Sequence, residues 1–408
     1  MKKTTVAIIG CGTAGAAAAL FLSRAGHDVT VFERVLDPQA VGAGVMIQPS
    51  GLSVLERLGC HERVLDRGAR VSRLLCENER NVAVVDLPYA SLGEGLYGVG
   101  LHRGVLFETL FTAVAASSAK LRCGVGIART VLLARGGRTL ITDEGEAIGH
   151  FDWVVVCDGA RSHVRDSMPE VSKTVTRYPW GALWFIGDDP EDHFGGRLHQ
   201  KVSGTRGMVG MLPTGQGPGP KPETKHTSLF FSVRGDEVDG WRARGLSPWK
   251  HEVLRIAPEA APLLLQIHDM DQLTFATYFD VTMPRWHAPA MVFLGDAAHA
   301  TSPQLGQGCN LALCDAAALA DAVSETRSIS EALEAYTARR REHLHFYQIA
   351  TRWLTPLFQS DLTPLAWARD LLMSRSSMLG FVEREMVRSM CGTKTGFIFG
   401  RMPTRVPS

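Results

Sequence analysis

The sequence predicts an α/β fold in which a domain of alternating strands and helices carries an inserted, mostly antiparallel sheet and ends in helices. Three observations support this. A glycine-rich turn follows the first apolar strand, three apolar strands end next to an acidic residue, and residues from about 175 to 280 read as strands of one sheet. Helical periodicity dominates after residue 308.

The composition indicates a globular chain and argues against two classes of partner. The 408 residues are 45% apolar and 21% charged, which allows two or three packed subdomains. A net charge of +1 gives no electrostatic basis for nucleic-acid binding. The sequence lacks an apolar run of membrane-spanning length, and the start Met-Lys-Lys-Thr-Thr leads directly into a strand. We therefore expect a cytoplasmic protein without a leader and without membrane association.

The eight cysteines do not follow a metal-binding pattern. None are spaced C-x-x-C, and the sequence shows no His/Cys cluster typical of zinc. Cys309 lies in a glycine-rich loop, but Cys314, five positions later, does not have the spacing of a dithiol couple. We expect reduced, partly buried thiols and no metal site.

The first strand and the turn after it predict a nucleotide site. Residues 6–9 form an apolar strand, Gly10, Gly12 and Gly15 fit G-x-G-x-x-G, and an alanine-rich helix follows. The next strand ends on Glu33, at the spacing expected of a carboxylate that binds ribose hydroxyls. Arg34 is either close to an adenine or phosphate or is an ordinary surface arginine.

Three later segments extend this site. The backbone of Gly44 and Val45 is expected to lie along a cofactor, because glycine permits close approach. Arg103 begins a helix, a position that suits a phosphate ligand and equally suits an exposed charge. The strand over residues 151–157 ends at the turn Asp158-Gly159, a further carboxylate at a strand end.

The last strand of this pattern covers residues 290–294 and delivers Asp296 to a Gly/Pro-rich loop. Asp296 is suited to accept hydrogen bonds from sugar-alcohol hydroxyls. Gly306 and Gly308 let the backbone approach a flat ring, and the helix that follows directs free N–H groups and partial positive charge at that ring. A plain strand-to-helix connection remains the alternative.

Taken together, these motifs resemble the single-component (group A) flavoprotein monooxygenases of the para-hydroxybenzoate hydroxylase fold, among them the salicylate-hydroxylase-like and ubiquinone-biosynthesis-hydroxylase-like enzymes. The resemblance runs from the first strand to about Ala320. It implies a Rossmann-like FAD-binding domain. It also implies that NADH or NADPH binds only transiently as reductant, which agrees with the lack of a second G-x-G-x-x-G in the sequence.

The resemblance also assigns residues to parts of FAD. Ala14 and Glu33 would contact the ADP half, Ile127 the adenine side and Asp296 the ribityl chain. Arg103 would reach the phosphate and ribityl region, and Asp158 and Gly159 would shape the groove for FAD and the nicotinamide nucleotide. The ring edge would receive backbone N–H groups from Gly308, Cys309 and Asn310.

The implied reaction is hydroxylation of an aromatic or otherwise electron-rich small molecule by O2 through a flavin C4a-hydroperoxide. The substrate would lie between the flavin and the sheet of residues 175–280, near Pro303. The candidate wall residues are Trp180, Leu183, Phe185, Met208, Met211, Phe230 and Tyr278. Strand alternation directs only one face to a pocket, so at least half of them are expected to be sheet core. His199 and Tyr278 are guesses for a group that assists deprotonation, and the catalytic base is left unknown.

Other reactions stay open, because fold alone does not fix the chemistry. A halogenase, dehydrogenase or reductase of the same fold would share the glycine loop, and a non-catalytic flavin redox sensor is a further alternative. The halogenase signature Trp-x-Trp-x-Ile-Pro is absent, since Trp180 and Trp184 are spaced differently and lack the Ile-Pro.

The expected division of the chain has three parts. Residues 1–72, 96–174 and 281–350 form the FAD-binding domain, 73–95 and 175–280 the substrate-binding sheet domain, and 351–408 a C-terminal helical cap. A homodimer is compatible with this arrangement.

Overall fold

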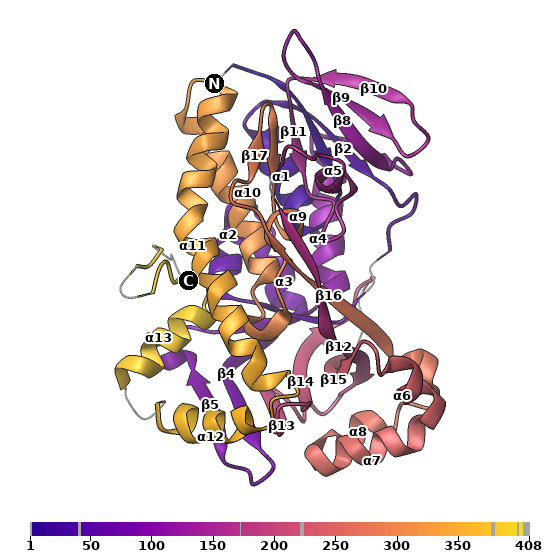
Figure 1. Cartoon of the computed structure of the whole chain (residues 1–408), viewed down its shortest axis with the longest axis vertical. Helices are drawn as coiled ribbons and strands as arrows, with labels where there is room; N and C mark the ends of the chain where they lie inside the picture. The colour runs from indigo at the N-terminus through magenta and orange to yellow at the C-terminus, as the bar shows by residue number, and fades with distance from the viewer. Residues whose placement is uncertain are drawn as a thin grey trace.

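Two large β-sheets and the helices that cover them make up the computed structural model of the chain (Figure 1). The structure describes residues 2–39, 42–171, 173–220, 224–376, 380–397 and 400–402. Residues 403–408 of the expected C-terminal cap lie outside them.

The six-stranded sheet has the strand order β17-β18-β11-β1-β2-β7, and all neighbours except the β17–β18 pair are parallel. Its strands are β1 (Thr5–Ile9), β2 (Asp28–Glu33), β7 (Lys120–Cys123), β11 (Trp153–Val156), β17 (His287–Ala288) and β18 (Met291–Phe293). The central strands β1, β11 and β18 are buried almost throughout, which explains their continuous apolar sequence.

The nine-stranded sheet is mostly antiparallel, in the order β16-β12-β15-β14-β13-β4-β6-β3, with β5 paired to β4. Its strands are β3 (Gly44–Ile47), β4 (Ala69–Asn78), β5 (Ala83–Pro88), β6 (Gly98–His102), β12 (Thr174–Asp188), β13 (Gly196–Ser203), β14 (Gly207–Gln216), β15 (Lys225–Arg234) and β16 (Thr274–Thr282). A separate three-stranded sheet contains β8 (Ile127–Leu132), β9 (Arg138–Thr142) and β10 (Ala147–Phe151).

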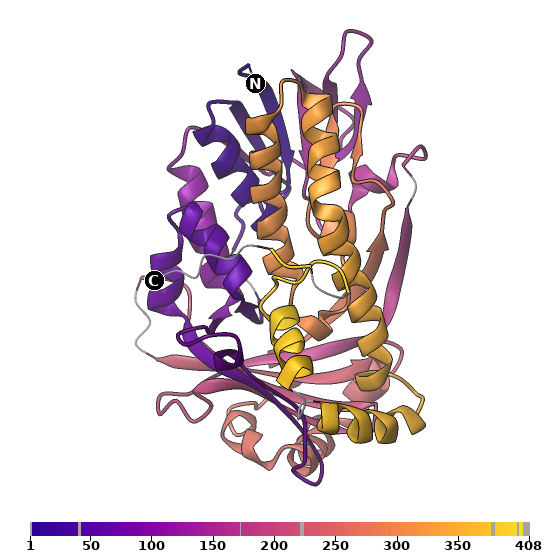
Figure 2. The same cartoon turned by 90° about the vertical axis from the view of Figure 1, so that its left-hand side faces the viewer.

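Helices α1, α4 and α10 pack together against the six-stranded sheet, and α11 runs beside α10 down to the nine-stranded sheet (Figures 1 and 2). The helices before α11 that contribute to the main core are α1 (Thr13–Arg24), α2 (Pro49–Arg57), α3 (His61–Arg67), α4 (Arg103–Ala115), α5 (His163–Asp166), α9 (Asp296–His299) and α10 (Gly308–Glu325). The others are α6 (Val238–Arg244), α7 (Leu246–Ile256), α8 (Ala261–Leu264), α11 (Ile329–Phe358), α12 (Pro364–Ser376) and α13 (Gly380–Met390).

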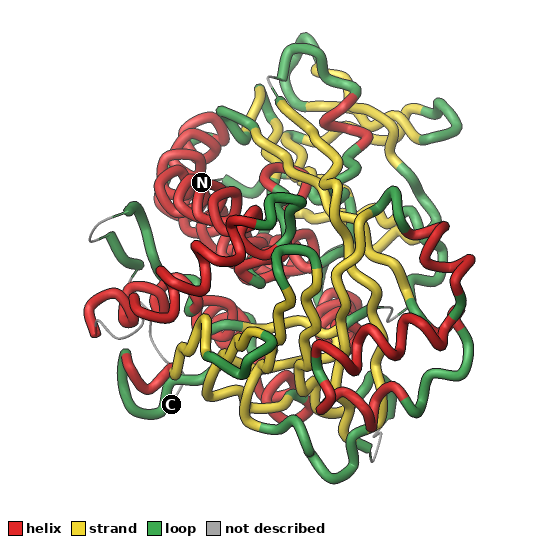
Figure 3. The backbone as a smooth tube through the Cα atoms, turned by 60° about the horizontal axis from the view of Figure 1, so that its bottom comes forward, coloured by secondary structure: helices red, strands yellow, loops and turns green. Residues whose placement is uncertain are grey.

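The nine-stranded sheet is covered on both faces. Helices α6–α8 cover the face that we call outer, which points away from the six-stranded sheet (Figures 1 and 3). The inner face is turned towards α10 and α11, and helices α11–α13 pack over part of it. A pocket between the two sheets must therefore use the inner face.

Strands β3 and β6 join the nine-stranded sheet although they fall in ranges assigned above to the FAD-binding domain. β3 pairs with β6 antiparallel, and β6 pairs with β4. Segments predicted for the FAD-binding domain and for the substrate-binding sheet domain therefore share this sheet. The division into domains stays a proposal.

Candidate active site

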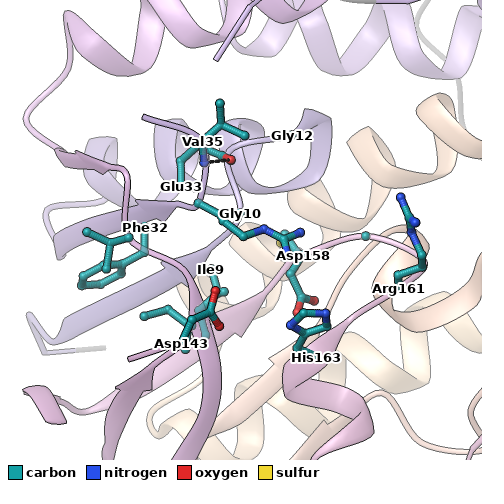
Figure 4. Close-up of a pocket in the computed structure, with 15 residues that line it drawn as sticks. Ile9, Gly10, Gly12, Phe32, Glu33, Val35, Asp143, Asp158, Arg161 and His163 are labelled. Atoms are coloured by element: carbon teal, nitrogen blue, oxygen red, sulfur yellow. Dashed lines mark hydrogen bonds between the residues drawn. The ribbon is translucent and has the colours of Figure 1, made fainter. Parts of the chain in front are cut away.

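The carboxyl edge of the six-stranded sheet gathers the residues that follow its parallel strands. Gly10 follows β1, Glu33 ends β2, Asp158 follows β11 and Gly295 follows β18. Parallel strands all point the same way, so their carboxyl ends meet at one edge, where ligands of open α/β sheets bind. A cavity of about 250 Å³ opens here (Figure 4). Its lining comprises Ile9, Gly10, Gly12, Phe32, Glu33, Arg34, Val35, Val125, Ile127, Asp143, Cys157, Asp158, Gly159, Arg161 and His163.

The three glycines of the first turn serve two purposes. Gly10 has φ +93°, and a Cβ there would lie 2.5 Å from the Cys157 carbonyl oxygen. Gly10 therefore lets the end of β1 approach the turn after β11. A Cβ on Gly15 would overlap the Gly10 carbonyl, so Gly15 lets helix α1 pack closely on the end of β1. Gly12 instead faces open space beside the start of α1, where its backbone leaves room for a ligand. Ala14 is buried in the core of this packing.

Glu33 has its carboxylate fixed by the backbone around it. Oε2 accepts the Cys11 N–H at 2.8 Å, and Oε1 accepts the Val35 N–H at 3.1 Å. A carboxylate offers about four acceptor sites, so both oxygens retain room for a ribose hydroxyl. Arg34 and Ile127 line the same cavity (Figure 4 shows Glu33).

Asp158 carries a buried carboxylate oxygen that lacks a hydrogen-bond partner among the described residues. This atom is Oδ1, whereas Oδ2 accepts the Val164 N–H at 3.4 Å. Burial raises the pKa of Asp158, and hydrogen bonds from Ser162 and Val164 oppose the rise. Next to it, Gly159 has φ +84° and open space where a side chain would be. An unpartnered polar atom at a cavity wall is a group that a polar ligand can satisfy.

Asp296 is exposed at the first position of α9 and faces the start of α10. Its Oδ1 lies 3.8 Å from the point where a Cβ of Gly308 would be. Gly306 has φ +60° and open space at its missing side chain. Pro303 is exposed in the short helix Pro303–Leu305 of the same loop.

The start of α10 has no side-chain cap. Its N-cap residue is Gln307, so the first N–H groups at Gly308 and Cys309 remain available, together with the partial positive charge of an 18-residue helix. Cys309 Sγ lies 3.5 Å from Thr13 Oγ1, and burial raises the pKa of Cys309. The thiol therefore stays protonated and is a poor nucleophile.

Asn310 uses its side chain within the protein. Its Oδ1 accepts the Gln48 N–H at 2.8 Å, and its Nδ2 donates to the Met46 carbonyl at 3.0 Å. These bonds tie the end of β3 to α10, and only the backbone N–H of Asn310 is left for a ligand.

Gly44 lies where a side chain would collide with the nine-stranded sheet. A Cβ there would lie 2.7 Å from Ser228 Cβ and 2.8 Å from Thr214 Cγ2, so glycine lets β3 pack on the nine-stranded sheet. This packing accounts for the glycine, and the placement of the Gly44 and Val45 backbone along a cofactor stays a prediction. Val45, its neighbour, is half-buried and packs against the main core.

Arg103 is exposed at the first position of α4, and its guanidinium lacks a hydrogen-bond partner within the described part of the chain. Its positive charge acts on two other groups. It opposes the rise that burial produces in the pKa of Tyr278 and in that of Cys309. Arg103 thus lies near both the inner face of the sheet and the start of α10.

An aromatic cluster lies on that inner face. Tyr278 accepts a hydrogen bond from Trp184 Nε1 at 3.1 Å, and the rings of Trp184 and Phe230 are 5.1 Å apart. Burial raises the pKa of Tyr278 to about 12, so its hydroxyl is protonated at neutral pH. Trp184 was not among the predicted wall residues: alternation places it on the opposite face from Leu183 but does not say which face borders the pocket.

Several predicted wall residues do not face this region. Leu183, Phe185 and Met211 are buried in the outer core with α6–α8, so their assignment to the substrate wall is wrong. Alternation placed them on the opposite face from Trp184. Trp180, in contrast, lies on the same face of β12 as Trp184, and the guanidinium groups of Arg206 and Arg234 lie 5.7 and 6.0 Å from its ring.

Two further candidates have other partners. Met208 is on the inner side but packs against the C-terminal helices. His199 belongs to a buried ion cluster in the outer layer: its Nε2 lies 2.8 Å from Glu77 Oε2 and its Nδ1 3.4 Å from Glu259. It does not lie where it could act on a substrate at the inner face.

A buried charge network beneath the Asp296 loop was not predicted. Asp315 accepts the Gly295 N–H at 2.8 Å and bonds His299 at 2.6 Å and Arg340 at 2.7 Å. His299, Arg340 and the Gly295 N–H together lower the pKa of Asp315 to about 2, although its burial acts in the opposite direction. The network fixes the turn that presents Asp296.

Arg165 connects this loop to the Asp158 turn. Its buried guanidinium donates to the Ala297 carbonyl at 3.0 Å and to the Ala160 carbonyl at 2.9 Å. Arg165 is thus a positioning residue, and the two strand-end carboxylates are held in one rigid frame.

The geometry fits FAD. Three features at the carboxyl edge of the six-stranded sheet suit such a ligand. Gly12 has open space at its missing side chain, and Asp158 Oδ1 lacks a partner among the described residues. Asp296 is exposed and faces the start of α10. Over the residues that the structure describes, we find no cluster of three or more His, Cys, Asp or Glu side chains that could hold a metal ion. Within the same residues, no helix combines the length and apolar character needed to cross a membrane.

Similar proteins of known activity are monooxygenases. 3-Amino-4-hydroxybenzoate 2-monooxygenase of Streptomyces cremeus is 29% identical, over 78% of this chain and 78% of that protein. 6-Hydroxynicotinate 3-monooxygenase of Pseudomonas fluorescens is 23% identical, over 84% of this chain and 88% of that protein. The expected activity, an FAD-dependent monooxygenase with NADH or NADPH as the reductant typical of such enzymes, is confirmed.

Solved structures confirm the fold. The complex of Klebsiella pneumoniae HpxO with FAD and uric acid has a TM-score of 0.80 at 21% identity, covering 95% of this chain and 97% of that one. The tetrameric form of 2-methyl-3-hydroxypyridine-5-carboxylic acid oxygenase has a TM-score of 0.73 at 22% identity, covering 92% and 98%. The predicted para-hydroxybenzoate hydroxylase fold is correct. Because residues 3–346 match the family described as FAD binding domain, the chain belongs to that family, as an FAD-dependent monooxygenase.

Proposed function

We propose that this enzyme hydroxylates a small aromatic molecule bound between the start of α10 and the aromatic cluster Trp184, Phe230 and Tyr278. The supporting observation is the aromatic cluster on the inner face of the nine-stranded sheet, the face turned towards α10. The charge of Arg103 acts on Tyr278 in this cluster and on Cys309 at the start of α10.

FAD would extend along the edge of the six-stranded sheet. Glu33 would hold the ribose, the turn at Gly12 would admit the pyrophosphate, and Asp296 would accept hydrogen bonds from the ribityl chain. When bound, FAD supplies electron transfer from NADH or NADPH and activation of O2. The N–H groups of Gly308 and Cys309 would stabilise negative charge on the ring.

Tyr278 would act as a hydrogen-bond donor to the substrate. Its pKa of about 12 keeps its hydroxyl protonated at neutral pH, and Trp184 already donates to its oxygen. The hydrogen of Tyr278 is therefore free to bind an acceptor, and the positive charge of Arg103 would favour an ionised one. We propose that the substrate carries an acidic hydroxyl or a carboxylate on its ring. The relatives named for 3-amino-4-hydroxybenzoate and 6-hydroxynicotinate act on rings of this type.

The experiment is NAD(P)H-dependent oxygen uptake with a panel of phenols, hydroxypyridines and quinolones, each compared with an analogue that lacks the acidic group. We expect the substrate to accelerate flavin reduction and one atom of 18O2 to enter the product. A product that carries oxygen only from water, or a chloride-dependent modification, would exclude hydroxylation. Comparison of NADH with NADPH in the same assay identifies the reductant.

Two further expectations concern the oligomeric state and the cellular location of the protein. We propose a homodimer and a cytoplasmic location. Light scattering after size-exclusion chromatography tests the first, for which a monomer or a tetramer is the contrary result. Cell fractionation tests the second.

A further inference from the structure

The end of helix α13 is bound to the rest of the protein through four successive backbone carbonyls, from Ser389 to Gly392. We call these residues the carbonyl segment. They lie outside residues 3–346, over which the family match extends. In order, the carbonyls accept hydrogen bonds from Tyr347 Oη at 2.9 Å, Gln307 Nε2 at 2.6 Å, the Ser50 N–H at 3.2 Å and His343 Nε2 at 3.0 Å.

This arrangement is unusual for a helix end. The last carbonyls of a helix lack partners within it and commonly bind water. Here their partners come from the start of α2, from the residue before α10 and from α11. The segment is braced from its other side, because Lys394 forms an ion pair with Glu385 of α13 and both side chains are mostly buried.

Gly392 is required for this close approach. Its φ is +76°, and a Cβ would overlap Ser50 Oγ and lie 2.9 Å from Gln307 Oε1. The backbone of the carbonyl segment thus contacts the side chain of Gln307 directly.

Gln307 is the N-cap residue of α10, and its side chain does not cap its own helix. It points instead to the carbonyl segment, donating to the Met390 carbonyl, and the whole residue is only 4% exposed. The bond has two consequences. It fixes the backbone immediately before Gly308, and it keeps the Gln307 amide oxygen away from the first N–H groups of α10, for which a released side chain would compete.

We propose that the carbonyl segment, acting through Gln307, positions the start of α10 for the flavin ring and keeps its N–H groups free. Gln307 is in this sense a positioning residue, and Tyr347, bound to the same segment, supports it. The inference rests on the proposed placement of the ring at Gly308.

The primary test is Gln307→Leu, which keeps much of the side-chain volume and removes the donor. FAD affinity is measured by fluorescence titration of apoprotein, and the reduction potential of the bound flavin by dye equilibration. Loss of one buried hydrogen bond corresponds to about a fivefold to tenfold change in an equilibrium constant, and we expect FAD binding to weaken by about that factor. We also expect a lower potential, because a less ordered helix start stabilises the reduced ring less.

Gln266→Leu is the matched control. Gln266 Nε2 also donates to two backbone carbonyls, Asp188 at 2.9 Å and Pro262 at 3.1 Å, but in the outer layer. This variant is expected to lower thermal stability without changing FAD affinity or potential. Tyr347→Phe removes a more distant bond to the same segment and is expected to give a smaller change in the direction of Gln307→Leu.

The outcomes separate the inference from the proposal on which it rests. If Gln307→Leu and Tyr347→Phe lower only thermal stability, like the control, the carbonyl segment is mere packing and the inference is wrong. If Gly308→Val also leaves FAD affinity unchanged, the proposed placement of the ring fails as well. If circular dichroism shows that Gln307→Leu does not fold, the flavin potential is measured in Tyr347→Phe and in Gln307→Asn instead. The shorter amide of Gln307→Asn can cap α10 itself.

Discussion

Asp158 and Asp296 both follow a strand of the parallel sheet, yet their surroundings differ. One buried oxygen of Asp158 has no hydrogen-bond partner among the residues that the structure describes, whereas Asp296 is exposed and faces Gly308. The sequence predicted both carboxylates, because a strand end and a glycine turn are local features. Their difference in exposure depends on the neighbouring loops that Arg165 joins.

At this scale we predict that Asp296→Ala weakens FAD binding by about 1–3 kcal/mol, the cost of leaving a buried hydroxyl of the ligand unpaired. Fluorescence titration of apoprotein measures the change. Asp321→Ala is the control, since Asp321 lies on α10 but pairs with Arg57 at the surface. Equal affinities for the two variants would mean that Asp296 does not contact the ribityl chain.

At the scale of elements, strand alternation decides which residues reach the substrate. In β12 and β15, Leu183 is paired with Phe231 and Trp184 with Phe230, and the two pairs face opposite sides of the sheet. Both faces are covered by helices, so the residues on each are apolar. For this reason apolar character alone did not reveal which face was the pocket side.

We predict opposite phenotypes for two substitutions in these neighbouring strands. Leu183→Ala removes a side chain that is 2% exposed in the outer core and should lower the free energy of unfolding by about 2–5 kcal/mol, with little change in KM. Phe230→Ala should raise KM and the fraction of oxygen released as hydrogen peroxide. Urea unfolding and coupled oxygen and peroxide assays measure these quantities. A normal KM in Phe230→Ala would remove the aromatic cluster from the substrate site.

At the scale of the whole molecule, Asp315 joins elements that lie far apart in the sequence. It binds the β18 turn through Gly295, α9 through His299 and α11 through Arg340. Arg340 in turn donates to His343, whose Nε2 reaches Gly392 beyond α13. The FAD-binding part and the C-terminal helices are thus connected through buried polar groups.

The network predicts a pH-dependent contribution to stability. Removal of the charge in Asp315→Asn leaves a buried arginine without its partner, and should lower the free energy of unfolding by about 3–5 kcal/mol at pH 7. The folded-state pKa of Asp315 is depressed from 3.8 to about 2, so the stabilisation is present above pH 4 and is lost as the pH falls towards 2. Urea unfolding of both proteins at a series of pH values should show their difference shrinking over that interval. A difference independent of pH would contradict this assignment.

The sequence by itself determined the frame of the site: the glycine turn, Glu33, the Asp158 turn and the Asp296 loop. Each is encoded in a short segment, and the parallel arrangement of the strands brings all of them to one edge. The tertiary structure decided the rest. Contacts between distant segments determine that Trp184, and not Leu183, faces the inner side of the sheet. They also form the Asp315–Arg340 pair and the bond from Gln307 to Met390. Such contacts follow from sheet pairing and helix packing, and neither leaves a local pattern in the chain.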